Sequence, residues 1–336
     1  MKRLLAFSLF CLLLWSCAAT IPSYEKINGV SFVASRDAVS QEHIDPVINV
    51  NANYAAVMPF GFIRDVKSPE LIHNTKRQWY GERRDGAKQY IEMLHKNNIK
   101  VMIKPQIWIR RGEFTGHLKM DTEDSWKKLE ATYETFILEY AELAKETNVA
   151  MYCIGTELNA FVIARPEFWN QLIAKVKNIY KGKLTYAENW DTFDSVPFWG
   201  ELDFIGIDAY FPLSEEETPT METLRKSWQI HKEGIQKLHR EINRPILFTE
   251  YGYRSTNFTA KEPWNSNHEI KEMNLDGQTI ALQALFDEFW SEDWFAGGFI
   301  WKWFHAHDKV GGMSDSQFTP QNKPAEEIVR TIYSYN

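Results

Sequence analysis

Two short apolar segments decide the fold: VAMYCIGTEL at Val149–Leu158 and PILFTEYG at Pro245–Gly252. Each is a continuous run of apolar, strand-forming residues, which predicts a strand buried on both faces of a parallel sheet. Each run also carries a glutamate near its end, Glu157 in the first and Glu250 in the second. Parallel (β/α) barrels keep their chemistry at the carboxyl ends of the strands. We therefore expect both carboxylates on one rim of such a barrel.

Strand-like and helix-like patterns alternate through eight rounds from about residue 27 onward. The predicted strands are Ile27–Phe32, Tyr54–Phe60, Lys100–Trp108, Val149–Leu158, Leu184–Asn189, Asp203–Tyr210, Pro245–Gly252 and Phe295–Phe304. The clearest predicted helices are Arg83–Asn97, Glu123–Thr147, Pro166–Lys181, Thr220–Asn243 and Leu275–Glu292, whereas Asp194–Gly200 predicts only a turn. Because no composition break or Gly/Ser linker interrupts the series, it predicts an α/β protein built as a single (β/α)8 TIM barrel over residues 27–336.

The N-terminal residues resemble an export signal. Lys2 and Arg3 precede the apolar run Leu4–Trp15, which is too short to span a bilayer and indicates a secretion signal. The run stops at Ser16-Cys17, as in a bacterial lipoprotein signal, where the cysteine becomes the lipidated N-terminus; the alternative is an ordinary Cys17 beside a conventional cleavage site. We expect residues 1–16 to be removed, Cys17 to carry lipid and residues 17–26 to form a short tether. The expected location is then a bacterial membrane, on its periplasmic or cell-surface face, reached by export across the inner membrane.

Composition argues against several classes of partner. The formal net charge is −7, and an acidic chain argues against nucleic acid. Of three cysteines, Cys11 leaves with the signal, Cys17 is the lipid site and Cys153 stands alone, so we expect no internal disulfide and no cysteine-bound metal. The run His305–Asp308 contains two histidines and an aspartate, but the other strand ends offer Gln, Asn, Trp and Tyr instead of further metal ligands. We expect no metal, no cofactor and a monomer.

Aromatic and hydrogen-bonding residues gather at the predicted strand ends. They are Lys104, Gln106 and Trp108 in the third strand, Asn189 and Trp190 after the fifth, Tyr210 after the sixth, and Trp301 and Trp303 in the eighth. A sugar offers an apolar face on which an indole can stack and hydroxyls that need partners. Core packing is the alternative for each of the 13 tryptophans, and it is favoured for Trp126 and Trp169 in predicted helices. The rim therefore predicts a cleft for a β-linked polysaccharide or oligosaccharide.

The two rim glutamates suit hydrolysis of a glycosidic bond. That reaction needs one acid to protonate the leaving oxygen and one carboxylate to attack the anomeric carbon. Each glutamate alone could instead cap a helix or pair with a surface lysine. That alternative is less favoured because both glutamates occupy the same position at the end of a predicted strand. Asp191 and Asp208 are rival carboxylates, and the apolar neighbours of Asp208 favour a structural hydrogen-bonding role for it.

Several motifs resemble glycoside hydrolase family 113. They are GTEL at Gly155–Leu158, LTYAENWD at Leu184–Asp191, FWGELDFIGIDAYFPL at Phe198–Leu213, ILFTEYGYRS at Ile246–Ser255 and FIWKW at Phe299–Trp303. The resemblance covers nearly all of the chain after the signal, in order and at suitable spacing. That family lies in the retaining clan A of (β/α) barrels, and its characterised members are mostly β-mannanases.

The resemblance implies a role for each matched residue. Glu157 would be the acid/base, Glu250 the nucleophile, Tyr210 the residue that orients Glu250, and Trp301 the floor of the subsite for the sugar being cleaved. Contacts to sugar hydroxyls would come from Asn189, Lys104 and Gln106. Most clan members have Asn directly before the acid/base, whereas this chain has Thr156. The contact to the sugar 2-hydroxyl must therefore come from elsewhere, and Asn189 is the candidate.

The leading hypothesis is a retaining β-glycoside hydrolase that acts on β-1,4-mannosidic bonds. The alternatives are a non-catalytic glycan-binding lipoprotein on the same barrel, and a glycosidase or transglycosylase for another β-linked glycan. Two carboxylates supported by Tyr210 favour an enzyme, because binding alone does not require such a pair. The sequence does not identify which β-glycan is cleaved. It also does not distinguish endo from exo cleavage, because the height of the loops around the cleft decides that.

Overall fold

The computed structural model describes residues 25–266 and 272–335. The predicted signal, Cys17 and most of the predicted tether lie outside these residues. Within them, eight parallel strands close into a barrel in the order β1-β11-β10-β9-β8-β7-β5-β2. The strands are β1 (Ile27–Phe32), β2 (Tyr54–Val57), β5 (Lys100–Ile103), β7 (Met151–Thr156), β8 (Lys183–Asn189), β9 (Ile205–Asp208), β10 (Ile246–Tyr251) and β11 (Phe295–Trp303). The predicted (β/α)8 architecture is confirmed.

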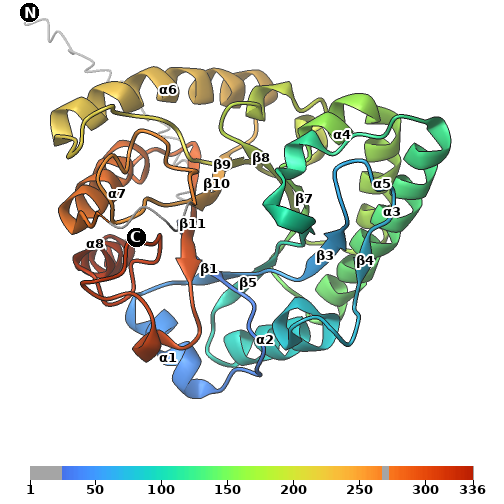
Figure 1. Cartoon of the computed structure of the whole chain (residues 1–336), viewed down its shortest axis with the longest axis horizontal. Helices are drawn as coiled ribbons and strands as arrows, with labels where there is room; N and C mark the ends of the chain where they lie inside the picture. Colours follow the sequence, from blue (N-terminus) through green and yellow to red (C-terminus); the bar gives the residue numbers. More distant parts are fainter. Residues whose placement is uncertain (1–24, 267–271, 336) are drawn as a thin grey trace, which may run out of the picture.

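The helices form an outer ring around the strands (Figure 1). They are α1 (Gln41–Asn49), α2 (Arg84–Lys96), α3 (Glu123–Glu146), α4 (Asn159–Ala164), α5 (Pro166–Ile179), α6 (Met221–Ile242), α7 (Leu275–Phe289) and α8 (Pro324–Ser334). The segment predicted as a turn between β8 and β9 contains two short 3-10 helices, Phe193–Ser195 and Trp199–Glu201. Among the described residues, none of the helices is both long and apolar enough to cross a membrane.

Local side chains fix where the long helices begin. The Thr122 hydroxyl accepts a hydrogen bond from the backbone N–H of Ser125 at the start of α3. Thr220 does the same for Thr223 at the start of α6, and Asn274 caps α7. Such caps satisfy backbone donors that have no partner inside the helix, and each typically contributes about 1 kcal/mol.

The structure departs from the prediction in the second and third strands. The predicted strands Tyr54–Phe60 and Lys100–Trp108 are each divided, at Pro59 and Pro105, because proline lacks the N–H that a strand ladder needs. The segments after the two prolines leave the barrel and pair with each other in a small rim sheet. That sheet has the order β4-β3-β6, with β3 (Phe60–Ile63), β4 (Ile72–His73) and β6 (Gln106–Ile109). It raises one wall of the barrel mouth.

Apolar side chains fill the barrel and the layer between strands and helices. All residues of β1, β9 and β10 are buried, as expected of strands covered on both faces. The cluster inside the barrel consists of Ile27, Ala56, Met102, Met151, Cys153, Ala187, Leu247, Ala296 and Phe299. Since the interior below the rim is packed solid, polar chemistry is confined to the upper ends of the strands.

Candidate active site

Strand register brings the candidate site residues to one level. In the ladder between β8 and β9, Asn189 lies opposite Asp208, and in the ladder between β9 and β10, Asp208 lies opposite Glu250. The next strand round, β7, is followed directly by Glu157, whose backbone N–H donates to the carbonyl of Ala187 at 2.8 Å. The two glutamates predicted from sequence therefore share the carboxyl-terminal rim of the barrel.

Three donors hold the carboxylate of Glu250. Its Oε1 accepts from Lys104 Nζ at 2.5 Å and from Gln106 Nε2 at 2.9 Å. Its Oε2 accepts from the Tyr210 hydroxyl at 2.9 Å. Glu250 is only 6% exposed, so protein donors replace most of the water around its carboxylate. Burial and the charge of Glu250 raise the pKa of Tyr210 well above its usual value, so the hydroxyl keeps its proton and remains a donor.

Lys104 lies beneath Glu250. Its side chain has no exposed surface, and its ammonium also donates to both carboxylate oxygens of Asp208, at 3.1 and 3.2 Å. Burial alone would lower the pKa of Lys104, but the charges of Asp208 and Glu250 outweigh it and the pKa is raised. The predicted contact between Lys104 and a sugar hydroxyl is wrong for this geometry, because every approach to the ammonium is occupied by protein. Lys104 instead provides the positive charge under the nucleophile candidate.

Asp208 is a structural partner of that lysine. It is fully buried and accepts a further hydrogen bond from Thr249 Oγ1 at 2.7 Å. Burial, followed by the charge of Glu250, raises the pKa of Asp208 to about 7. With no exposed surface Asp208 has no access to a substrate, which matches the structural role that its apolar neighbours predict.

Glu157 occupies a setting that favours its protonated form. Burial, followed by the charges of Asp208 and Glu250, raises its pKa well above the usual value for a carboxyl. Its side chain is half-buried and lines the cleft together with Glu250. Its backbone lies in the left-handed region, with φ of +50°, which is uncommon for a residue other than glycine. A carboxyl with a raised pKa is suited to act as a proton donor.

A buried network fixes the backbone around Glu157. The N–H of Leu158 donates to the Tyr186 hydroxyl at 2.7 Å, and that hydroxyl donates to Glu188 Oε2 at 3.2 Å. Glu188 is fully buried, and burial raises its pKa to about 7. Its Oε1 accepts from the backbone N–H of Asn189 at 2.8 Å. The sequence analysis did not assign Glu188 a role, although its spacing of two from Tyr186 places both side chains on one side of β8.

A cleft of about 810 Å³ crosses the rim above these residues. Both glutamates line it, and so do five of the predicted sugar contacts: Gln106, Trp108, Asn189, Trp190 and Trp301. Trp108, on the rim sheet, is 51% exposed. Trp190 stacks on Trp264 with ring centroids 5.1 Å apart and planes 19° apart. Trp264 lies in the stretch after β10, which the sequence indicates as a lid on the leaving-group side or a surface excursion, and it was not among the predicted sugar contacts.

Trp301 is held close to the Glu250 strand. A Cβ on Gly252 would lie 2.4 Å from the carbonyl oxygen of Trp301, so glycine is required for this approach of the two backbones. The peptide bond between Trp301 and Lys302 is cis.

Trp303 is not part of the cleft, so its predicted contact with sugar is wrong. It has no exposed surface and packs against the ring of His307, with centroids 5.7 Å apart. The ladder between β1 and β11 pairs Val30 with Ile300 but Phe32 with Trp303, so β11 contains one extra residue. An extra residue reverses the alternation of side chains along a strand. Trp301 and Trp303 therefore do not share a face, although their spacing of two predicts that they do.

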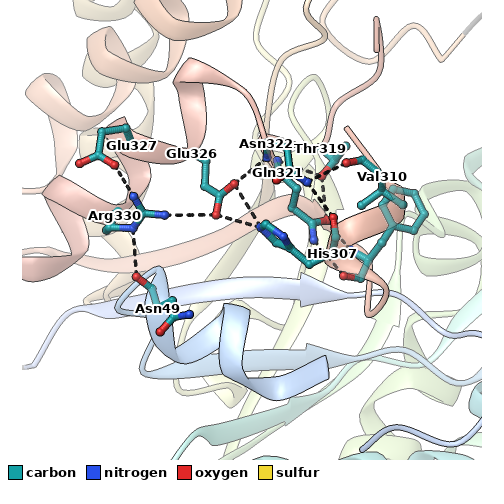
Figure 2. Close-up of polar contacts among 10 residues, drawn as sticks. Asn49, His307, Val310, Thr319, Gln321, Asn322, Glu326, Glu327 and Arg330 are labelled. Carbon is teal, nitrogen blue, oxygen red and sulfur yellow. Dashed lines mark hydrogen bonds and ion pairs between the residues drawn. The ribbon is translucent and has the colours of Figure 1, made fainter. Parts of the chain in front are cut away.

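The loop after β11 is tied down by polar contacts (Figure 2). His307 Nε2 lies 3.0 Å from Glu326 Oε1 on α8, and the Asn322 side chain donates to the carbonyls of His307 and Val310 at 2.7 and 2.9 Å. Arg330 joins Glu326 to the carbonyl of Asn49 at the end of α1. His307 thus fixes this loop to its neighbours. In the parts of the chain that the structure covers, no three His, Cys, Asp or Glu residues are placed to bind a metal ion.

A (β/α)8 barrel with carboxyls after its fourth and seventh barrel strands, β7 and β10, and an aromatic cleft between them has the form of a glycoside hydrolase. The family model for Glycoside Hydrolase Family 113 matches residues 34–323. The chain belongs to that family and is a glycoside hydrolase, as its motifs indicated.

Solved structures share the fold at low sequence identity. The GH113 β-mannanase AaManA from Alicyclobacillus acidocaldarius, in complex with ManMIm, superposes with a TM-score of 0.77 at 22% identity, covering 92% of this chain and 97% of that one. A GH113 β-1,4-mannanase gives 0.80 at 21% identity, covering 93% and 100%. The β-glucuronidase from Ruminococcus gnavus gives 0.62 at 14% identity, covering 93% of this chain and 50% of that one. No curated protein sequence matches significantly.

Proposed function

We propose that the protein is a retaining β-glycoside hydrolase that cleaves β-1,4-mannosidic bonds in mannan or manno-oligosaccharides. The observation that carries the mechanism is the difference between the two carboxyls. Glu250 receives three hydrogen bonds, one of them from a buried ammonium, whereas burial and neighbouring negative charge raise the pKa of Glu157. A carboxyl with a raised pKa suits the general acid, and a carboxylate that three donors hold in place suits the nucleophile.

In the first step, Glu250 attacks the anomeric carbon while Glu157 donates its proton to the departing glycosidic oxygen. A covalent glycosyl-enzyme forms on Glu250, and the leaving sugar takes the proton. Glu157 is now a carboxylate and removes a proton from water, which attacks the anomeric carbon and releases Glu250. The product keeps the β configuration. Two similar structures are described as β-mannanases, and this supports mannan as the substrate.

The pair is tested by separate substitutions. Glu250→Ala should abolish turnover. Glu157→Ala should retain activity on aryl β-mannosides with a good leaving group, which needs little protonation, and added azide should restore its rate and give a β-glycosyl azide. NMR should show the β anomer as the first product of the unaltered enzyme. An α anomer appearing first would refute retention, and full activity of Glu250→Ala would refute the site assignment.

We further propose that the protein is exported and anchored to a bacterial membrane through lipid on Cys17. The support is the sequence alone: the apolar run Leu4–Trp15 and the Ser16-Cys17 junction. A single lipidated terminus can hold a soluble domain at a membrane. Cys17→Ala should move the protein from the membrane fraction to the soluble fraction of a bacterial host. Retention of the processed variant in the membrane fraction would contradict the anchor.

A further inference from the structure

The catalytic cleft continues past Trp301 into a second hollow of about 770 Å³. The two share Gln106, Ile107, Trp108 and Trp301 as walls. Aromatic side chains dominate the second hollow, among them Phe60, Phe62, Trp79 and Phe304. Neither Glu157 nor Glu250 lines the second hollow, but Gln106, which donates to Glu250, lines both hollows. Because the hollow begins at this neighbour of Glu250, it lies on the side of the sugar that becomes bound to Glu250.

Lys302 carries a positive charge into this hollow without an ionic partner. Its ammonium lies over the rings of Phe304 and Trp301, 5.1 and 5.6 Å from their centroids. Within residues 25–266 and 272–335, no carboxylate lies within 4.0 Å of it and no hydrogen bond to it is found. Burial lowers the pKa of Lys302, and the charges of Glu250 and Asp315 only partly offset this.

Other buried lysines of this chain are compensated. Lys104 lies between Asp208 and Glu250, and the ammonium of Lys323 is 3.1 Å from Asp315. Removing an ammonium from water costs free energy unless a paired charge or hydrogen bonds replace the water. A partly desolvated, unpaired ammonium in the wall of a cleft is therefore placed for a ligand.

The remaining charges of the hollow do not neutralise Lys302. Arg77 also lines it, is exposed, and makes no ion pair among the residues described. The carboxylate in this wall is Glu82, and its Oε2 accepts from the backbone N–H of Trp79 at 2.8 Å. The hollow thus combines ring faces suited to sugar with two cations.

We propose that this side of the cleft binds an acidic sugar, a uronosyl unit of a β-linked glycan, whose carboxylate pairs with Lys302. The inference rests on the proposed glycosidase function and narrows its substrate class. A carboxylate supplies the charge-assisted hydrogen bonds that the ammonium lacks, whereas a neutral hexose offers only hydroxyls. The aromatic walls hold the sugar ring in either case, so Lys302 sets the preference between acidic and neutral units.

The test uses matched substrates. The neutral member is the 4-nitrophenyl β-glycoside of β-1,4-mannobiose, and two acidic members carry a C6 carboxylate on the outer or the inner sugar. The ratio of kcat/KM, acidic over neutral, is measured for the unaltered enzyme, Lys302→Met, Lys302→Arg and Lys309→Met. Lys309 is exposed on the loop that follows β11, seven residues after Lys302, and lines neither hollow, so it is the matched control. The Glu250→Ala variant, which should not turn over these compounds, measures their binding by calorimetry.

We expect one acidic substrate to exceed the neutral one, and Lys302→Met to lower that ratio by about tenfold or more. Lys302→Arg should keep part of the preference and Lys309→Met all of it. Turnover of the neutral substrate with no acidic preference would overturn the acidic subsite and leave the mannosidase function standing. If the acidic compounds bind more tightly than the neutral one but no compound is turned over, the mannosidase function is overturned and the acidic subsite stands. If Lys302→Met is unstable, the ratio for the unaltered enzyme and Lys302→Arg still decides.

Discussion

Replacing Tyr210 by phenylalanine removes one hydroxyl and almost no volume. That hydroxyl donates to Glu250 Oε2 at 2.9 Å, whereas Lys104 and Gln106 both bind Oε1. In Tyr210→Phe, therefore, Oε2 loses its partner and the carboxylate can rotate about the contacts that remain. A hydrogen bond to a charged group is worth about 1.5–3 kcal/mol. Since about 1.4 kcal/mol corresponds to a factor of ten in rate, the loss in kcat should be roughly 10- to 150-fold.

Tyr253 provides the matched control. It is 1% exposed and its hydroxyl has no hydrogen-bond partner among the described residues. Tyr253→Phe removes the same group from a comparably buried site of the same barrel, and it should leave kcat within about twofold. Both variants are assayed with an aryl β-mannoside and with the polymer, and their unfolding is followed in denaturant.

Three outcomes would refute the reasoning about Tyr210. They are a loss of less than about twofold in Tyr210→Phe, an equal loss in Tyr253→Phe, or a fall in stability of Tyr210→Phe that accounts for the lost activity. Any of these would mean that the hydroxyl serves packing or folding and does not act on Glu250.

Three further predictions concern buried charge and the aromatic cleft. Burial raises the pKa of Glu188 to about 7 in the native state, so the native protein binds a proton more tightly than the unfolded chain. The free energy of unfolding should therefore fall as pH rises from about 4.5 to 7. Glu188→Gln should reduce this fall in denaturant unfolding; an unchanged slope against pH would contradict it. Lys104→Met removes the cation that Glu250 and Asp208 share, so kcat/KM should fall by about tenfold or more, with a loss of about 3–5 kcal/mol in unfolding free energy. An unchanged kcat/KM in the folded variant would count against this role of Lys104. Trp264→Ala removes the ring stacked on Trp190. Both rings line the cleft but not the second hollow, so we expect them on the leaving-group side. The change should then raise KM for manno-oligosaccharides that extend beyond the leaving sugar but not for aryl mannosides; equal effects on both would contradict this placement.

The sequence by itself determined the barrel and the rim on which Glu157 and Glu250 lie. Continuous apolar runs require cover on both faces, and eight of them alternating with amphipathic segments leave a closed (β/α)8 barrel as the simplest solution. Residues at the ends of such runs reach the same rim whatever the details of packing. Glu157, Tyr210 and Glu250 could therefore be placed from chain position alone.

The tertiary structure decided what each rim residue touches. Lys104 and Gln106 are two residues apart, but Lys104 is buried under Glu250 whereas Gln106 lines the cleft. They differ because Pro105 separates the barrel strand from the rim sheet between them. An extra residue in β11 turns Trp303 away from Trp301. Burial and ion pairing depend on residues distant in sequence, since 146 positions separate Lys104 from Glu250. The pattern of apolar residues sets which element forms, but the closure of the barrel sets which charges are paired.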